Sequence, residues 1–460
     1  MKISELDEAI YNRYIAPSRR PQSKKAGLEF ELPIVNTAEK AVDFSVVHRA
    51  AELFAAEFGF TGISRDDDGY IYNAADHLTG DILSFDCSYN TLELSFGAEE
   101  NIHDVDARFR KYYSFLKYEL EKDGHTLTGM GINPNYKVNN NVPVKSERYR
   151  MLLHHLSSYK KYGNSVPFHD HPNFGLFSCA SQVQLDVEEE YLAETLNTFN
   201  RLEPLKAIMF ANSIWNEDGA DLLCSRDYFW RNSLHGLNPH NVDMFGVEFE
   251  SADEIIAYIR SMSMYCVQRE GKYINFVPTP LTEYFSADSI KGEYFDGISY
   301  KQIDFRPELT DLEDLRSFKF EDVTFRGTVE FRSVCEQPVS EIFAAGAFHA
   351  GLLENLGELT DLLKDDHVIY HKGYNAEELR RIFTGRKIPE IFDRDEISKL
   401  LLRILGIAED GLEQRGFGEE TYLEPLYPRA EKLMSPAAEM LIGLKNGKAT
   451  EEYISEYGRL

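Results

Sequence analysis

The sequence of 460 residues predicts an α+β protein in which a mixed region is followed by an all-helical part. Segments such as Gly27–Leu32 alternate apolar and polar residues, which is the period of a half-buried strand. Longer segments such as Val105–Glu121 repeat apolar residues at spacings of three and four, which is typical of helices. From Ser340 onward only the helical pattern continues. We therefore expect one region over residues 1–340 and a helical region over residues 341–460 packed on it.

The first part of the chain mixes both patterns. It begins with a short amphipathic helix and a basic link, Ser4–Tyr14 and Ser18–Lys25. Strands are predicted at Gly27–Leu32, Ile82–Asp86 and Thr91–Phe96, and helices at Val46–Glu57, Val105–Glu121 and Glu147–Tyr159. Between them, turn-forming and polar residues predict irregular segments at Asp66–Asp81 and Asn133–Ser146.

The second part contains fewer strands and ends in helices. Strands are predicted at Phe177–Asp186 and Thr328–Val334. A long helix over Val187–Asn212 carries three glutamates at its start, where acids complement the helix dipole. The remaining predicted helices are Ala252–Cys266, Ser340–Leu363, Ala376–Thr384, Arg394–Gly406 and Ala430–Leu444.

Composition and charge exclude several classes of protein. Asp and Glu outnumber Lys and Arg by 77 to 49, a formal charge of −28 that disfavours nucleic acid as a partner. A hydrophobic content of 43% excludes a disordered acidic tail, and the apolar runs are too short to span a membrane. The five cysteines are scattered and lack CxxC spacing, so we expect a reduced, cytoplasmic protein.

The first predicted strand places two carboxylates on one face. Glu29 and Glu31 alternate with apolar residues, and side chains at i and i+2 of a strand project together, about 7 Å apart. Carboxylates at that separation are within reach of one or two metal ions. The strand therefore predicts a metal site as well as a polar face.

Three further strands show the same parity. Taken in chain order, the polar faces carry Glu29 and Glu31, then Glu93, then Gln182 and Gln184, then Glu330 and Arg332. Any one of these strands is also typical of an antiparallel strand with one face in water. Together they are dominated by Glu and Gln, with one Arg and no Lys, and Asp86 ends the preceding strand. If they share a sheet, the acids converge on one wall and need cations, for which Mg²⁺ or Mn²⁺ is suited.

The presence or absence of other motifs limits the kinds of nucleotide and metal site that the chain can form. No GxxxxGK[ST] loop, no GxGxxG after a strand and no HExxH occurs, so a nucleotide site here has to be built on metal ions. Arg332 beside Glu330 is suited to hold a transferring phosphoryl group. The histidines of Phe168–Pro172 lack a third ligand at a defined spacing and predict a polar loop. Cys87 and Cys335 lie on the opposite strand face and are expected in the core.

With these residues in order, the chain resembles the glutamate–cysteine ligases of the plant-like branch, within the carboxylate–amine ligase group related to glutamine synthetase. The resemblance covers roughly residues 25–340. The matching segments are Gly27–Glu31 (GLEFE), Ser84–Ser95 (SFDCSYNTLELS), Gly129–Pro134 with Arg148–Tyr149, Ser178–Asp186 (SCASQVQLD), Pro204–Ser213 (PLKAIMFANS), Ser225–Trp230 (SRDYFW) and Thr328–Pro338 (TVEFRSVCEQP).

The resemblance implies a fold and a set of roles. It implies a curved, mostly antiparallel sheet that forms a funnel-shaped active site, packed by helices, with the catalytic region at 1–340. Arg332 and Glu330 would be catalytic. Gln182, Arg226, Arg148 and Arg332 would bind substrate or nucleotide. The metal ligands, for two or three Mg²⁺ with Mn²⁺ as the alternative, would be Glu29, Glu31, Asp86, Glu93 and Glu330.

The activity implied is ATP-dependent formation of γ-glutamylcysteine, the first step of glutathione biosynthesis. The γ-carboxylate of L-glutamate would be activated as an acyl phosphate and then joined to the amine of L-cysteine. A second hypothesis keeps the fold with a different amine or acid, and a third keeps it for phosphoryl transfer alone. A non-catalytic metal- or ligand-binding relative is the fourth. The sequence leaves the oligomeric state open between monomer and dimer.

Overall fold

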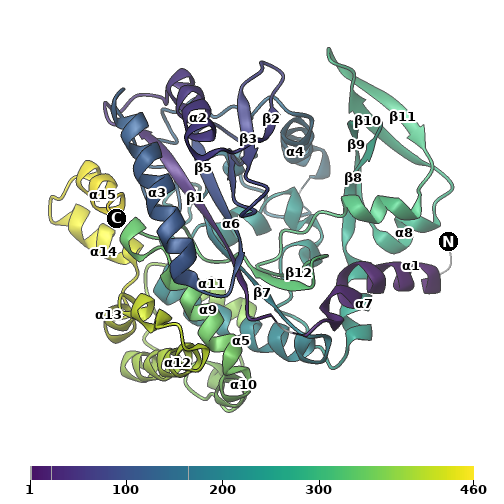
Figure 1. Ribbon diagram of the computed structural model, residues 1–460. Coiled ribbons are helices and arrows are strands. Elements are labelled where there is room, and N and C mark those ends of the chain that lie inside the picture. The colour runs from purple at the N-terminus through teal and green to yellow at the C-terminus, as the bar shows by residue number, and fades with distance from the viewer. Residues whose placement is uncertain (1–2, 22, 164) are drawn as a thin grey trace.

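The computed structural model describes residues 3–21, 23–163 and 165–460, and it contains two antiparallel sheets surrounded by helices (Figure 1). The larger sheet has the strand order β12-β13-β7-β1-β5-β4-β3-β2, and β6 pairs with the far end of β1. Its strands are β1 Ala26–Asn36, β2 Gly62–Arg65, β3 Ile71–Ala75, β4 Ile82–Ser84, β5 Thr91–Glu99, β6 His125–Leu127, β7 Ser181–Asp186, β12 Glu321–Val323 and β13 Thr328–Phe331. The α+β class and the antiparallel sheet predicted above are confirmed.

The four strands that share the polar parity lie side by side in the order β13-β7-β1-β5. This adjacency is the condition on which the predicted wall of acids depended, and it is fulfilled. The apolar residues of β1 face the other side, where Phe30 contacts Phe109 of α3 (Ile102–Glu121) and Phe343, with ring centroids 5.4 and 5.2 Å apart. On the same side, Gly346 of α9 (Ala344–Glu354) lets that helix approach Leu28 closely.

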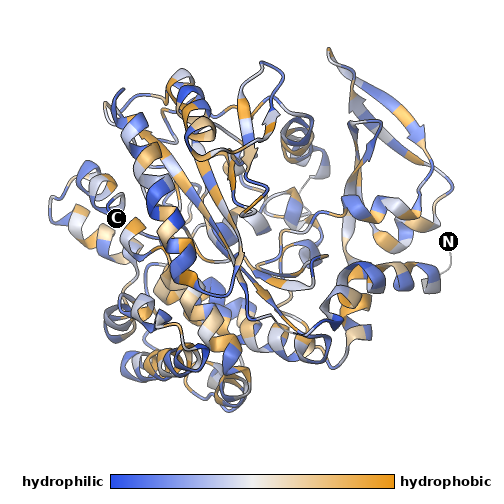
Figure 2. Ribbon diagram, in the orientation of Figure 1, coloured by the Kyte–Doolittle hydropathy of each residue, from blue (hydrophilic) through white to orange (hydrophobic). Residues whose placement is uncertain are grey.

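The large sheet therefore has one dry and one polar face. Figure 2 shows hydrophobic residues along the central strands and polar residues on the outer surface of α3. The dry face is covered by α3 and α9, which contact β5 and β1, respectively. Burying the apolar half of each strand fixes the register, because a slip by one residue would turn the acids into the core.

A smaller sheet follows in the middle of the chain, with the order β11-β10-β9-β8. It lies beside α7, α8 and α1 and apart from the large sheet (Figure 1). Its elements are α7 Ala252–Ser261, β8 Ser263–Arg269, β9 Lys272–Pro280, α8 Leu281–Ser286, β10 Ile290–Phe295 and β11 Tyr300–Phe305. The predicted helix Ala252–Cys266 is wrong beyond Ser261. Met262 has an extended backbone (φ −67°, ψ 158°), which ends the helix, and β8 starts at Ser263 and pairs with β9 through a turn at Glu270 and Gly271, both with positive φ.

Four further helices of the first part agree in position with the prediction. They are α1 Ile3–Ile10, α2 Phe44–Phe58, α4 Glu147–Ser157 and α5 Leu192–Phe210, whereas the short helix α6 Arg226–Arg231 was not predicted. The glutamates predicted at the start of α5 precede it in a 3₁₀ turn, Glu189–Tyr191. The segment Asp66–Asp81, expected to be irregular, contains β3 between two turns. Among the described residues, no helix is both long enough and apolar enough to cross a bilayer.

The part after residue 340 is helical, as expected. It contains α9, α10 Leu356–Lys364, α11 Ala376–Phe383, α12 Arg394–Arg415, α13 Leu426–Lys432, α14 Pro436–Lys445 and α15 Thr450–Tyr457. The single helix predicted over Ala430–Leu444 is wrong. Leu433 has φ +49°, in the left-handed region, and Ser435 caps a new helix that starts with Pro436. Helix α11 packs against α5, and α12 against α9.

Candidate active site

A cavity of about 660 Å³ lies on the polar face of the large sheet. It is lined by most of the residues that the sequence predicted as functional, namely Glu29, Asp86, Glu93, Arg148, Gln182, Glu330 and Arg332. Glu31 and Arg226 do not line it, and both are buried, with exposed fractions of 5% and 3%. A second cavity of about 630 Å³ adjoins the first and shares Glu29, Ser95, Gln184 and Arg326 with it.

Three acids form a compact group at one end of this face. Glu31 of β1 lies directly opposite Glu93 of β5, and Asp86 reaches them from the loop after β4. One carboxylate oxygen from each residue lies within 4.8 Å of the other two. Cys87, the next residue in this loop, has φ +61°, in the left-handed region that non-glycine residues seldom adopt. Among the described residues, this is the group whose spacing suits a metal ion.

The carboxylate of Glu31 is held in place from the side of β7, and Glu93 and Asp86 are each held by a hydroxyl group. The backbone N–H of Ala180 donates to Oε2 of Glu31 at 2.6 Å, and the amide of Gln182 donates to Oε1 at 2.8 Å. The hydroxyl of Ser95 donates to Glu93 at 2.6 Å, and the hydroxyl of Tyr149 to Asp86 at 3.4 Å. These donors fix the carboxylates before any ligand binds, which a rigid site requires.

Burial and mutual repulsion disfavour the charged forms of these acids. The pKa of Glu31 is raised to about 8, first by burial and then by the charge of Asp86, while Arg226 acts in the opposite direction. The pKa of Glu93 is raised to about 7 by burial and by Asp86. Acids crowded in this way are stable as anions only beside a cation, and three carboxylates are suitable ligands for Mg²⁺. The residues present therefore fit the metal that the sequence predicted.

The other two predicted ligands form a separate pair. The side-chain amide of Gln184 lies between Glu29 and Glu330 and donates to one oxygen of each, at 2.9 and 3.0 Å. Arg332 donates through Nη1 to the other oxygen of Glu330 at 2.8 Å. The pKa of Glu29 is raised well above its ordinary value by burial and by the charges of Glu330 and Glu93. The five acids thus form two groups on one wall, a division that strand parity alone did not predict.

The three predicted arginines differ in their access to the cavity. Arg332 lines the cavity, and although burial opposes its charge, Glu330 and Glu29 raise its pKa above the ordinary value. Arg148, the second residue of α4, also lines the cavity, next to Tyr149. Arg226 starts α6 and stacks over the ring of Trp230 at 4.6 Å, and its buried Nε has no hydrogen-bond partner among the described residues.

Several cavity residues were not singled out from the sequence. Arg316 and Arg13 line the same cavity as Arg148. Arg326, in the turn between β12 and β13, donates to Oε1 of Gln184 at 3.1 Å. No periodic pattern marks these arginines, because they lie in loops and at helix ends. Gln184 was on the predicted polar face, but its bridging position depends on the strand order.

The cysteines and the histidine loop lie as the sequence predicted. Cys87 and Cys335 are buried, and all five cysteines are free. His169 bonds the carbonyl of Phe229 and His171 bonds Asp218, so the histidine loop is a polar loop.

Comparisons with known proteins assign the chain to a family. The model of glutamate–cysteine ligase family 2 (GCS2) matches residues 52–457, so the strand with Glu29 and Glu31 lies outside the matched part. The chloroplastic glutamate–cysteine ligase of Solanum lycopersicum is 24% identical over 366 residues, which cover 77% of this chain and 64% of that protein. The Arabidopsis thaliana protein of the same name is 25% identical over 373 residues, with the same two shares. The chain thus spans less than two thirds of the length of these relatives.

Among solved structures, the glutamate–cysteine ligase of Francisella tularensis in complex with AMP is similar, with a TM-score of 0.49 and 13% identity. The match covers 95% of this chain and 87% of that one. The family model, which spans most of the residues that build the cavity, decides the assignment: the chain belongs to glutamate–cysteine ligase family 2.

Proposed function

We propose that the protein is an ATP-dependent ligase that joins the γ-carboxylate of L-glutamate to the amine of L-cysteine. The observation that carries this is the pair of acid groups on one sheet face with Arg332 beside the second group. Family membership and the names of the plant relatives support the choice of glutamate and cysteine. The product would be γ-glutamylcysteine, which places the protein in glutathione biosynthesis.

The chemistry needs charge neutralisation more than it needs a proton donor. A carboxylate has to approach the γ-phosphate of ATP, and both are anions that repel each other at short range. Two or three Mg²⁺ ions, held by Glu31, Asp86 and Glu93 and by Glu29 and Glu330, would neutralise the phosphates and the attacking carboxylate. The sheet fixes these ligands in advance, so little reorganisation is needed on binding.

The chain's own cations would act on the transferring group. Arg332 points a planar guanidinium into the cavity and is suited to bind the phosphoryl oxygens as they transfer to glutamate. Its ion pair with Glu330 holds it in place. The acyl phosphate so formed is then attacked by the amine of the second substrate, which releases phosphate and forms the amide.

We assign the two ends of the site from the charges of the residues that line them. The adjoining cavity carries Arg20, Lys25 and Arg326, so we assign the nucleotide to that side. Arg148 and Arg316, on the other wall, suit the carboxylates of amino acids. Gln182 lines the cavity and its amide is bonded to Glu31, while its buried Oε1 has no hydrogen-bond partner among the described residues, so we assign the glutamate to that side.

The decisive experiment is ADP release from Mg·ATP with glutamate, screened against a panel of amines that includes cysteine, with the products identified by mass. Turnover with cysteine and a γ-glutamylcysteine product supports the proposal. Turnover only with another amine would assign the protein to a different carboxylate–amine ligase. ADP release without an amide product would indicate phosphoryl transfer alone, and no turnover with any amine would favour a binding protein.

Two further expectations stay predictions. The cytoplasmic location rests on the cysteine content, whereas the plant relatives are named as chloroplastic proteins. Fractionation of cells from the source organism tests it. The oligomeric state, monomer or dimer, is measured by light scattering of the purified chain.

A further inference from the structure

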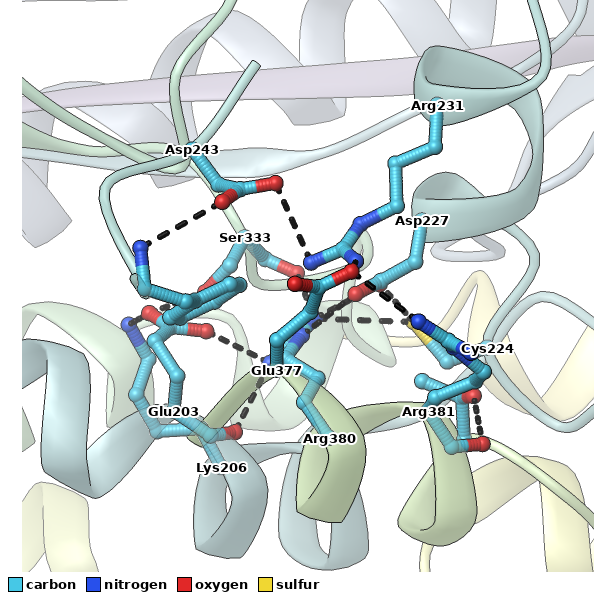
Figure 3. Close-up of polar contacts among 12 residues, drawn as sticks. Glu203, Lys206, Cys224, Asp227, Arg231, Asp243, Ser333, Glu377, Arg380 and Arg381 are labelled. Atoms are coloured by element: carbon cyan, nitrogen blue, oxygen red, sulfur yellow. Dashed lines mark hydrogen bonds and ion pairs between the residues drawn. The ribbon is translucent and has the colours of Figure 1, made fainter. Parts of the chain in front are cut away.

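A buried set of four charges joins the helical part of the chain to the region that carries the active site. Glu203 and Lys206 come from α5, Asp227 from α6 and Arg380 from α11, and we call them the Arg380 network. The side chains of Glu203, Lys206 and Arg380 are at most 1% exposed, and that of Asp227 is 11% exposed. Figure 3 shows Arg380 between Glu203 on one side and Asp227 on the other.

Arg380 uses every nitrogen of its guanidinium in this network. Nε and Nη2 donate to the two oxygens of Asp227 at 2.7 and 2.9 Å. Nη1 donates to Oε2 of Glu203 at 2.5 Å and to its backbone carbonyl at 2.8 Å. Lys206 pairs with the other oxygen of Glu203. Only an arginine has the planar fork that can hold both carboxylates at once.

Each carboxylate partner of Arg380 is connected to an arginine of the active site, either through the sequence or through a hydrogen bond. Asp227 directly follows Arg226, the buried arginine near Glu31. On the other side, Glu203 accepts a hydrogen bond at 2.8 Å from the hydroxyl of Ser333, which directly follows Arg332. Nη2 of Arg380 also lies 3.5 Å from the carbonyl of Ser333. One guanidinium therefore contacts both residues that directly follow these arginines, through the carboxylate of Asp227 and the carbonyl of Ser333.

A purely structural reason for this arrangement is weak. Replacing a buried ion network by apolar side chains of similar volume is often neutral or stabilising, so burying four charges is not needed to dock a helix. What the network adds is a fixed geometry. Its directional hydrogen bonds hold the segments of α6 and β13 in one position relative to each other. The arginines that these segments carry come from positions 226 and 332, far apart in the chain.

We propose that Arg380 is a positioning residue for the ligase reaction, through which the helical part of the chain sets the places of Arg226 and Arg332. The kinetic consequences of this inference rest on the proposed function. The placement of Arg226 and Arg332 by Arg380 rests on the geometry alone. It gives helix α11 a role in the active site although none of its residues lines the cavity.

The test uses Arg380→Lys, which keeps the charge and removes the fork. The matched control is Arg381→Gln on the same helix, where the side chain is 69% exposed and pairs only with Glu377. For Arg380→Lys we expect the KM for glutamate to rise and kcat to fall, each about tenfold, with the KM for the amine unchanged. A merely structural role would lower the folded, active fraction, which reduces apparent kcat and leaves the KM for glutamate as it was.

A double-mutant cycle identifies the residue through which Arg380 acts. If Arg380 works through Arg226, the effects of Arg380→Lys and Arg226→Lys on the KM for glutamate are not additive. Additive effects would overturn the proposal. If Arg380→Lys does not fold, Ser333→Ala isolates the branch to Arg332, and it should lower kcat about tenfold without changing the KM for glutamate. Unchanged kcat in that variant would equally overturn the proposal.

A structural readout separates this inference from the proposed function. Crystal structures of the wild-type protein and of Arg380→Lys, or of Ser333→Ala, show whether the guanidinium groups of Arg226 and Arg332 have moved from Glu31 and Glu330. If the wild-type protein forms no γ-glutamylcysteine but the arginines move, the proposed function fails and the positioning role stands. If ligase activity is present and neither arginine moves, the positioning role fails alone.

Discussion

Glu29 and Glu330 lie on strands two apart in the sheet, and the amide of Gln184, on the strand between them, donates a hydrogen bond to both. The amide is a neutral spacer between two anions that would otherwise repel each other. Each carboxylate keeps one oxygen that Gln184 does not contact, and in Glu330 that oxygen is bound to Arg332. The arrangement couples the second acid pair to the arginine that is assigned to the phosphoryl group.

Replacing this spacer tests the second acid pair. Gln184→Met has a similar length and no donor, so Glu29 and Glu330 lose a shared hydrogen bond and repel each other more strongly. We expect the Mg²⁺ concentration for half-maximal ADP release to change and the rate to fall about tenfold. Gln302→Met, in which the altered amide bonds only Glu293 on the small sheet, is the control. Identical Mg²⁺ dependence in all three proteins would exclude a role for Gln184 in metal binding.

Neutralising single acids tests the metal assignment. Glu93→Gln and Glu330→Gln each remove a charged ligand and keep the shape of the side chain. We expect glutamate-dependent ADP release to fall about 100-fold or more in each, with the melting temperature close to that of the wild type. Glu100→Gln, just beyond the end of β5 and exposed, should keep full activity. Full activity in both site variants would refute the metal assignment.

Acid should destabilise the fold through a buried histidine outside the metal groups. His155 of α4 stacks on Tyr265 with ring centroids 3.8 Å apart, and burial lowers its pKa to about 3. Between pH 6.5 and pH 3 the unfolded state binds a proton that the folded state does not. Stability is therefore fully present above pH 6.5 and falls below it, by about 1.4 kcal/mol per pH unit for this group.

The variant His155→Phe keeps the stacked ring and cannot be protonated. Its free energy of unfolding, measured with urea between pH 7 and pH 4, should decline less steeply than that of the wild type. Equal slopes would show that His155 is not the group that responds to acid. His77→Phe serves as a comparison, since that histidine belongs to the turn between β3 and β4.

The contact between α9 and α12 depends on two glycines. A Cβ on Gly411 would lie 2.0 Å from the backbone oxygen of Gly351, which is closer than atoms can approach. Gly411→Ala should therefore push the helices apart and cost about 1–3 kcal/mol of stability. Gly406→Ala, on the same helix with open space around it, should stabilise by about 0.5–1 kcal/mol. Denaturant unfolding measures both, and equal effects would contradict the close contact.

Much of the site could be predicted because strand parity is a local property. The period of two residues placed Glu29 and Glu31 together, and the same rule selected Glu93, Gln182 and Glu330 before any pairing was known. The order of the strands could not be read in the same way. It decides that Glu31 faces Glu93 while Glu29 is linked to Glu330, so the division into two groups became visible only in the folded sheet.

The errors in secondary structure have equally specific causes. The helix predicted to run through Cys266 was extended by the apolar residues of β8, which are buried on both faces and so do not alternate. No sequence pattern indicated that Arg380 is buried. It lies in a short amphipathic helix, where a basic residue is ordinarily exposed, and only the fold shows that it points inward.

The strand order also has a consequence for how the protein is made. Strand β1 leaves the ribosome early, but the strand that carries Glu330 is synthesised some 300 residues later. Until then β7 has an unpaired edge, and the second acid pair does not exist. Nascent chains that have not reached residue 328 would need protection of that edge and could not consume ATP, so catalytic competence would arise in one late step of biogenesis rather than gradually.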